Sequence, residues 1–313
     1  MKIRVHADDF GVSRGVTDGI LRCIDEGPVE GISIIANGTA FDHAVAALAS
    51  RPKIALSVHL NLVEGRPVTP AAELDLLVDA EGLLRNGFLS LWWAHARATS
   101  TARARLEAQV RAEFYAQATK VRRAVGRDVP LRLDSHGHLH HIPFVFRIVA
   151  DLCRDLPATG MRLVREPAFV LPRARGRHTL SGFAKHALLN VLARRHRAAT
   201  QARGVSVDDW VVGILLTGRM SSDAMDAALH RIRARAGNNH AAVSVEIIFH
   251  PGGAPPGEQA LWVRYPELVD YYSSPWHHFE SEALRSPELA ACLERWRDVR
   301  GPAAPPAGST TGS

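Results

Sequence analysis

The chain has 313 residues, of which 46% are hydrophobic and 22% charged, so length and composition suit one large α/β domain or two smaller ones. Its net charge of +6 rests almost entirely on arginine and comes with no nucleic-acid-binding motif, so we expect no nucleic-acid partner. Charges at Lys2 and Arg4 break up any signal peptide, no run is long enough to cross a bilayer, and the distant cysteines form no CxxC motif, which together predict a cytoplasmic protein.

Strand-like and helix-like segments alternate along the chain. Short apolar runs bounded by polar residues, glycine or proline predict strands, and apolar residues three or four apart predict helices. Ser13 can cap the first helix, and Gly27 can end it. In chain order we expect a strand at 2–7, a helix at 13–27, a strand at 32–35, a helix at 41–50, a strand at 54–59, a helix at 101–125, a strand at 131–134, a helix through 144–152, a strand at 161–164, a helix at 180–203, a strand at 211–216, a helix at 222–236, a strand at 243–249 and a helix at 287–299.

This alternation predicts a parallel sheet with helical crossovers. The number of strands favours a closed or nearly closed (β/α) barrel, although an open sheet also fits. We expect residues 1–299 to form this single barrel and residues 300–313, rich in proline, glycine and serine, to form a disordered tail. Residues 60–100 interrupt the alternation with prolines, glycines and an aromatic patch, so we expect a substrate-binding insertion there.

Several predicted strands end in residues that ionise or bind metals. These residues are Asp8 and Asp9, His59, Asp134 and His136, and His250. Because the carboxyl ends of parallel strands converge on one rim of a barrel, we expect one shared site. Asp9, His59 and His136 could offer a carboxylate and two imidazoles to a divalent metal, leaving positions for water and substrate. Asp8 would then act as a base beside the metal, and His250 would protonate a leaving group.

Each of these residues also has a plainer interpretation. An Asp-Asp pair after a strand is a common turn or helix-cap signal, and His59 or His250 could be a hydrogen-bonded histidine that ligates nothing. The histidines that begin at His136 are harder to explain in this way, because imidazoles two residues apart share one face of an extended segment. That run consists of His136, His138, His140 and His141, of which we expect one or two to be ligands.

The motifs, taken in order, resemble those of a known family. They are Ala7-Asp8-Asp9-Phe10-Gly11, Leu56-Ser57-Val58-His59-Leu60-Asn61-Leu62, Asp134-Ser135-His136-Gly137-His138-Leu139-His140 and Phe249-His250-Pro251. This set is similar to the YdjC-like carbohydrate deacetylases of the ChbG and HpnK type, from the N-terminus to about residue 255. Residues 162–167 and 216–220 resemble HpnK-like members further, whereas His6 stands where many relatives carry asparagine.

The resemblance implies a distorted (β/α) barrel of the polysaccharide-deacetylase type. It also implies metal-dependent removal of an N-acetyl group, with release of acetate, from an amino sugar such as an N-acetylglucosamine oligosaccharide or a hopanoid glycoside. Carried over by position, Asp8 matches the catalytic base and His250 the late acid or transition-state stabiliser, while Asp9, His59 and His136 match the metal ligands. Asn61, His138 and Arg162 are candidates for substrate-binding or supporting roles, Arg162 as an orienting partner of Asp8. The family is commonly described with Mg²⁺, whereas mixed Asp and His ligands also suit Zn²⁺ or Co²⁺.

Other functions and partners stay open at this point. The chain could be a metal-dependent hydrolase of a phosphoester or cyclic amide, or a saccharide- or membrane-binding protein without catalysis. The predicted helix 180–203 carries an apolar face, which could pack on the barrel or lie on an anionic membrane beside a lipid-linked substrate at the inner membrane face. We favour the packed arrangement. That face comprises Leu180, Phe183, Ala187, Leu188, Val191 and Leu192, and Arg194, Arg195, His196, Arg197 and Arg203 follow it. A homodimer is compatible with the sequence.

Overall fold

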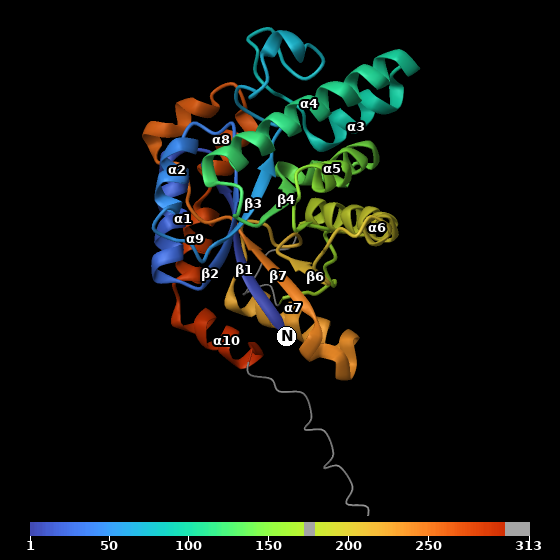
Figure 1. Ribbon diagram of the computed structural model, residues 1–313. Coiled ribbons are helices and arrows are strands. Elements are labelled where there is room, and N and C mark those ends of the chain that lie inside the picture. The colour runs from blue at the N-terminus through green and yellow to red at the C-terminus, as the bar shows by residue number, and fades with distance from the viewer. Residues whose placement is uncertain (172–178, 298–313) are drawn as a thin grey trace, which may run out of the picture.

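A curled sheet of parallel strands forms the centre of the computed structural model, which describes residues 1–171 and 179–297 (Figure 1). In this part of the chain seven strands lie in the order β5-β4-β3-β2-β1-β7-β6, and each neighbouring pair is parallel. The strands are β1 (Lys2–Phe10), β2 (Val29–Ile34), β3 (Ala55–Leu60), β4 (Leu131–Ser135), β5 (Gly160–Met161), β6 (Trp210–Val212) and β7 (Ser244–Phe249).

The two edge strands curl toward each other, and the chain beside them joins the edges. The amide of Met161 donates to the carbonyl of Ser206 at 2.9 Å, and the amide of Val211 donates to the carbonyl of Arg165 at 2.9 Å. The open sheet that the sequence leaves possible is therefore not the fold. The expected distorted (β/α) barrel is confirmed.

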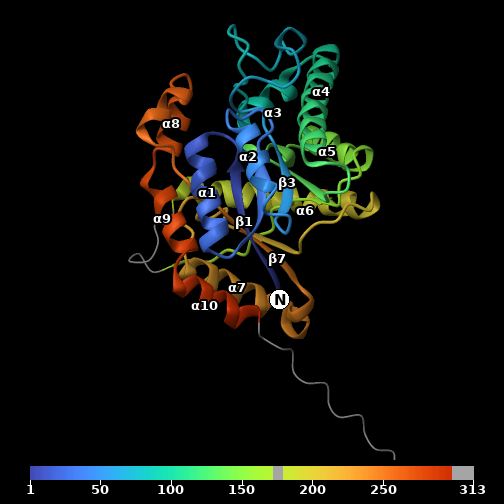
Figure 2. The ribbon, with the colours of Figure 1, turned by 60° about the vertical axis from the view of Figure 1, so that its left-hand side comes forward.

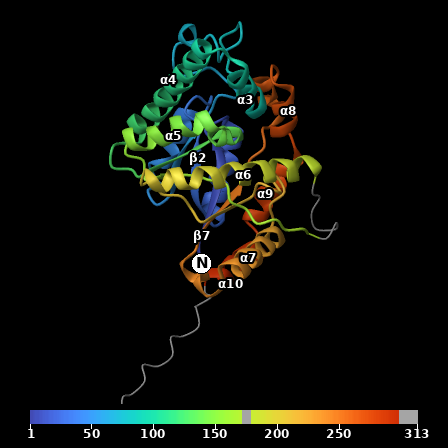
Figure 3. The same ribbon diagram turned by 90° about the vertical axis from the view of Figure 1, so that its right-hand side faces the viewer.

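Helices surround the sheet (Figures 1 and 3). α1, α2 and α9 lie along one side, α5 and α6 lie on the opposite side, and α7 and α10 lie near the chain's N-terminal end. Their bounds are α1 (Arg14–Glu26), α2 (Phe41–Leu48), α3 (Phe88–Arg97), α4 (Ser100–Val125), α5 (Pro143–Asp155), α6 (Leu180–Ala202), α7 (Ser222–Ala236), α8 (Pro266–Tyr272), α9 (Pro275–Leu284) and α10 (Pro287–Arg297).

The first helix shows how local sequence sets an element. Ser13 caps α1 by accepting a hydrogen bond from the amide of Val16, and Gly27 ends the helix, as predicted. Val16, Ile20 and Cys23 recur every three or four residues and are fully buried against the sheet. α1 is thereby fixed directly after the strand that carries Asp8 and Asp9.

Some sequence-based boundaries are wrong. The strand expected at 211–216 ends at Val212, because Gly213 has a φ of 122° and turns the chain across the carbonyl of Ile248. The strand expected at 161–164 pairs in the sheet only at Gly160–Met161. α3, α8 and α9 were not predicted as helices. The predicted tail, 300–313, and the last two residues of the helix expected at 287–299 lie outside the described residues.

α6 packs against α5 and the segment after β4, as favoured, but most of the face assigned to this packing is wrong. Its assigned core face is largely exposed, since Leu180 is 90% exposed and Val191 44%. Of that face only Leu192 is buried, together with Leu189 and Ala193 beside it. Within the described residues, none of the helices combines the length and the apolar character that crossing a membrane would require.

The carboxyl ends of the strands point to one end of the barrel, where α8 and residues 60–100 lie in all three views (Figures 1–3). Residues 60–100 contain α3 and a 3₁₀ turn at Ala71–Glu73. Whether they bind substrate stays a prediction. Their position places them over the rim that carries the predicted site residues.

Candidate metal and catalytic site

Asp9, His59 and His136 meet at this rim although they are far apart in sequence. One ligand atom of each lies within 4.8 Å of the others, and all three residues are buried. Asp9 Oδ1 lies 2.9 Å from His136 Nδ1 and 3.4 Å from His59 Nε2. Asp9 adopts a left-handed backbone conformation with φ 69°, which is uncommon for a residue other than glycine. The backbone is thus bent in a way that brings this carboxylate to the two imidazoles.

The chemistry of these three side chains fits a divalent metal ion. Burial lowers the pKa of the His59 imidazole, but the carboxylates of Asp134 and Asp8 outweigh that effect and raise it to about 10. Burial also lowers the pKa of His136, and Asp9 again raises it beyond the usual value. The buried carboxylates therefore stabilise positive charge at this position. Protonated imidazoles provide that charge, and a bound cation would provide it in their place. The donor set of one carboxylate and two imidazoles suits Zn²⁺, Co²⁺ or Fe²⁺ on ligand preference.

Asp134 fixes the orientation of His59. Its Oδ1 accepts a hydrogen bond from His59 Nδ1 at 2.7 Å, which leaves Nε2 of the ring facing Asp9. Ser33 donates to the other oxygen of Asp134 at 2.5 Å. A carboxylate behind a ligating histidine is a common device for setting the ring's tautomer and direction.

Asp8 lies in a two-point contact with Arg162. The guanidinium donates to both carboxylate oxygens, at 2.8 and 2.9 Å. Burial raises the pKa of the Asp8 carboxyl, but Arg162, together with His59 and His250, lowers it to about 2. The structure thus places Arg162 where the resemblance expected an orienting partner for Asp8, and Asp8 is ionised at neutral pH.

A second group also has ligand-like spacing and consists of His6, Asp8 and Asp134. The guanidinium of Arg162 already supplies a positive charge to this group. Arg162 contacts Asp8 and also lies 3.2 Å from Asp134 Oδ2 and 3.2 Å from Glu246 Oε2. Burial lowers the pKa of His6 to about 4, so this ring is neutral and only hydrogen-bonds its neighbours. Of the two groups, the Asp9 group is therefore the candidate for holding a metal ion.

His250 follows β7 and faces Asp8 across the rim. Its Nε2 lies 3.8 Å from Asp8 Oδ2, and burial lowers the pKa of its ring to about 4. Its backbone amide donates to Glu280 of α9 at 2.5 Å, and its carbonyl accepts a hydrogen bond from His277 at 2.5 Å. His250 is therefore held from α9 and is neutral at pH 7.

The other two supporting candidates lie further from the ligand group. Asn61 shapes the turn after β3, since its side chain bonds to the amide of Val63 and the carbonyl of Glu64. The expectation of an extended run from His136 is wrong, because His136–His141 forms 3₁₀ turns on either side of a kink, where Gly137 and His138 have φ of 61° and 60°. Only His136 therefore turns toward Asp9. His138 packs with His140 and His141 in a separate buried cluster, which has no ligand-like spacing among the described residues.

Sequence reasoning missed several residues at the rim. Glu64 Oε1 lies 3.5 Å from His136 Nε2 and accepts a hydrogen bond from the Tyr272 hydroxyl at 3.0 Å, while Glu64 Oε2 accepts one from the indole of Trp262. The Tyr271 hydroxyl lies 3.5 Å from Asp9 Oδ2. Glu246 carried a usable signal, because a carboxylate inside an otherwise apolar strand requires a buried partner. Trp262, Tyr271 and Tyr272, from α8 and the segment before it, carried no sequence signal that would have placed them at the rim.

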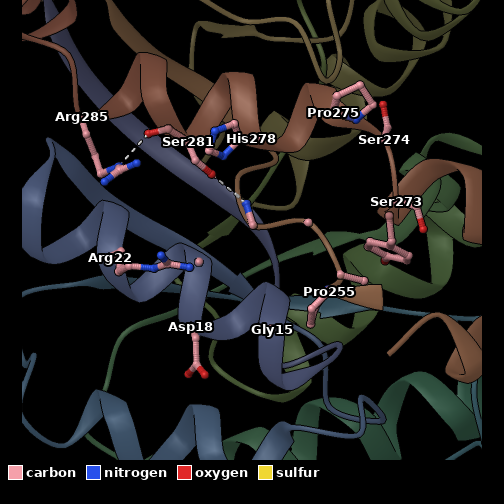
Figure 4. Close-up of a pocket in the computed structure, with 15 residues that line it drawn as sticks. Gly15, Asp18, Arg22, Pro255, Ser273, Ser274, Pro275, His278, Ser281 and Arg285 are labelled. Atoms are coloured by element: carbon pink, nitrogen blue, oxygen red, sulfur yellow. Dashed lines mark hydrogen bonds between the residues drawn. The ribbon is translucent and has the colours of Figure 1, made fainter. Parts of the chain in front are cut away.

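A cavity of about 450 Å³ lies outside this group, between α1, α9 and the loop after His250 (Figure 4). Here two backbones approach closely, since a Cβ on Gly19 would stand 2.5 Å from the Cα of Gly252. The hydroxyl of Ser281 on α9 accepts a hydrogen bond from the amide of Gly252 at 3.0 Å, drawn dashed in Figure 4. The loop that carries His250 is thus held between α1 and α9.

Relatives match this chain over almost its full length. The family model described as YdjC-like protein matches residues 2–295. A mouse protein named carbohydrate deacetylase (Mus musculus) is 32% identical over 94% of this chain and 91% of its own, and a human protein of the same name (Homo sapiens) is 33% identical over 94% and 87%. A crystal structure of a proposed cellobiose-phosphate cleavage protein from Enterococcus faecalis V583 shares the fold, with a TM-score of 0.67, 19% identity and 95% of each chain covered.

The fold and the site define a (β/α)-barrel protein with a buried Asp/His group suited to a divalent metal at the carboxyl ends of its strands. Within that class, the chain belongs to the YdjC-like family.

Proposed function

We propose that this protein is a metal-dependent hydrolase that removes the N-acetyl group from an N-acetylated amino sugar and releases acetate. The observation that carries the proposal is the pairing of a metal-type group, Asp9, His59 and His136, with an ionised carboxylate, Asp8, directly beside it. The relatives named carbohydrate deacetylase support the choice of a sugar amide over other bonds.

A divalent ion held by Asp9, His59 and His136 would supply a Lewis acid and lower the pKa of water. Asp8 takes the proton from the attacking water, and Arg162 keeps that carboxylate ionised and oriented. His250 is neutral at rest and therefore has to gain a proton before it can act as an acid. Its Nε2 is 3.8 Å from Asp8, so Asp8 can pass the proton to His250, which gives it to the departing amine.

An acetate-release screen across N-acetylglucosamine, its oligosaccharides and lipid-linked acetylated sugars tests this function. Asp8→Asn should lower the rate of release by about a hundredfold or more, while the matched control Asp42→Asn, at an exposed position on α2, should not. Phosphate release from a sugar phosphate, or opening of a cyclic amide, without acetate release would replace the proposal with another hydrolase activity. Saccharide binding without turnover under any divalent metal would favour a binding protein. Metal analysis of untagged protein would identify the ion, for which Mg²⁺, Zn²⁺ and Co²⁺ are the candidates.

A lipid-linked substrate, such as a glycosylated hopanoid, is a second form of this proposal. The exposed apolar residues of α6 support it, because Leu180 and Val191 are exposed and the exposed Arg194 lies one turn after Val191. Co-sedimentation with anionic liposomes that disappears in an Arg194→Gln/Arg195→Gln variant would support peripheral membrane contact. Equal sedimentation of variant and wild type would argue against membrane contact through Arg194 and Arg195.

A further inference from the structure

A second cavity, of about 360 Å³, lies between the first turns of α6 and the turn at residues 214–219. Its volume falls in the range of about 300–1,000 Å³ that is usual for small-molecule sites. The turn is held by Glu166, whose carboxylate accepts hydrogen bonds from the amides of Gly213, Ile214 and Leu215 at 2.7–3.1 Å. The cavity therefore has a fixed wall.

This cavity is tied to the candidate catalytic centre through Glu280. One oxygen of the Glu280 carboxylate accepts from the amide of Met220, just after the cavity wall, and the other accepts from the amide of His250. The same buried side chain thus sets the position of the wall and of the histidine that faces Asp8.

Lys185 of α6 lines the cavity. The residue is exposed to solvent at the cavity, and the protein atoms around it lower the pKa of its ammonium group by desolvation. The ammonium interacts electrostatically with Glu166, Asp8 and Asp9. Among the described residues it has no hydrogen-bond or ion-pair partner within contact distance, so its donors are free to bind a ligand.

The lining of the cavity indicates what it would accept. Its described residues include two cationic side chains, Lys185 and Arg219, and no carboxylate. Arg219 also lies 4.5 Å above the ring of Trp276, which is 37% exposed. Ammonium and guanidinium groups donate hydrogen bonds to hydroxyl oxygens, and they disfavour the free amine that deacetylation leaves on the reacting sugar.

We propose that Lys185 is a substrate-binding residue that holds the sugar unit next to the one being deacetylated, with this cavity as its subsite. The proposal rests on the proposed function for the identity of the reacting sugar. The binding site itself can be tested without turnover. Lys185 would donate to hydroxyl oxygens of the neighbouring unit and so determine a preference for disaccharides over monosaccharides.

The test compares Lys185→Met with Lys53→Met, the same change at an exposed lysine on the loop before β3. For N,N′-diacetylchitobiose, Lys185→Met should raise KM roughly tenfold or more with kcat nearly unchanged, because one hydrogen bond to a charged donor is lost. The KM for N-acetylglucosamine should not change. Lys53→Met should resemble wild type with both substrates.

Calorimetric binding of the deacetylated disaccharide provides a readout that needs no catalysis. Weaker binding by Lys185→Met, with normal binding by Lys53→Met, would support the subsite even if wild type released no acetate. A loss that is equal for both sugars, an unchanged Lys185→Met, or no binding of the disaccharide by wild type would overturn it. The equal loss would instead assign Lys185 to charge compensation of Glu166.

Discussion

Replacing Arg162 by methionine should destabilise the protein strongly at neutral pH. The guanidinium is 1% exposed and lies within 3.3 Å of three buried carboxylates, those of Asp8, Asp134 and Glu246. Methionine fills similar space but leaves these charges without a cation. Removing one partner of a buried ion pair typically costs about 3–5 kcal/mol, a large part of a total stability of about 5–15 kcal/mol. The midpoint of thermal unfolding should fall by on the order of 10 °C.

The pH dependence gives this prediction its sign. Against burial, Arg162 lowers the folded-state pKa of Asp8 to about 2, from an ordinary value of 3.8, and it also lowers the pKa of Glu246. A lowered carboxyl pKa contributes stability above the unfolded pKa, and that stability is lost as the pH falls through the folded value. Without Arg162 that contribution is absent, so the difference in free energy of unfolding between wild type and variant should be largest near pH 7. It should narrow between about pH 4 and pH 2.

Urea unfolding of both proteins from pH 7 down to the lowest pH at which wild type still folds would measure this gap. Arg162→Lys serves as the matched control, because it keeps a charge but loses the two-point contact, and its loss should be smaller. A gap that stays constant across this range, or an Arg162→Met variant as stable as wild type at pH 7, would refute the argument that these carboxylates depend on one guanidinium.

Three further outcomes follow from the site. Asp8→Asn should keep its bound metal while acetate release falls by about 10²–10⁴-fold, and a variant with wild-type turnover would remove Asp8 as the base. Gly19→Ala should lower kcat with metal content unchanged, because the added Cβ stands 2.5 Å from Gly252 Cα and displaces the loop carrying His250, whereas Gly87→Ala, with only ordinary contacts, should behave like wild type. A chelator should lower the melting temperature of wild type, because a metal at a hundredfold excess over its Kd adds about 2.7 kcal/mol to the free energy of unfolding. The melting temperature of His59→Ala should not change. Equal shifts in both proteins would place the metal elsewhere.

The barrel and the ligand group could be predicted from sequence for one physical reason. Each of Asp9, His59 and His136 follows an apolar run at a strand's carboxyl end, and a parallel barrel brings such ends together. Ser13 and Gly27 likewise act within a few residues of where they stand. Local patterns of this kind need no knowledge of distant contacts.

The rest of the site depends on distant contacts and could not be predicted. Tyr271 and Glu280 lie on short helices after β7, and their roles follow from packing against residues far away in the chain. The exposed face of α6 was misjudged for a related reason. Its buried face includes polar residues such as Asn190, which bonds to the backbone of Glu166, so apolar character alone chose the wrong face.

The edges of the barrel are joined at Met161 and Val211 by two backbone hydrogen bonds, with α6 and the Lys185 cavity on the same side of the molecule. By contrast, β1 and β7 at the centre of the sheet pair over six consecutive residues. Local opening of the barrel should therefore require the least free energy at this seam between β5 and β6. Amide hydrogens there should exchange with solvent faster than those of β1. The strands that carry Asp9 and His59, β1 and β3, lie inside the sheet, so local opening of the seam would leave these two residues in place.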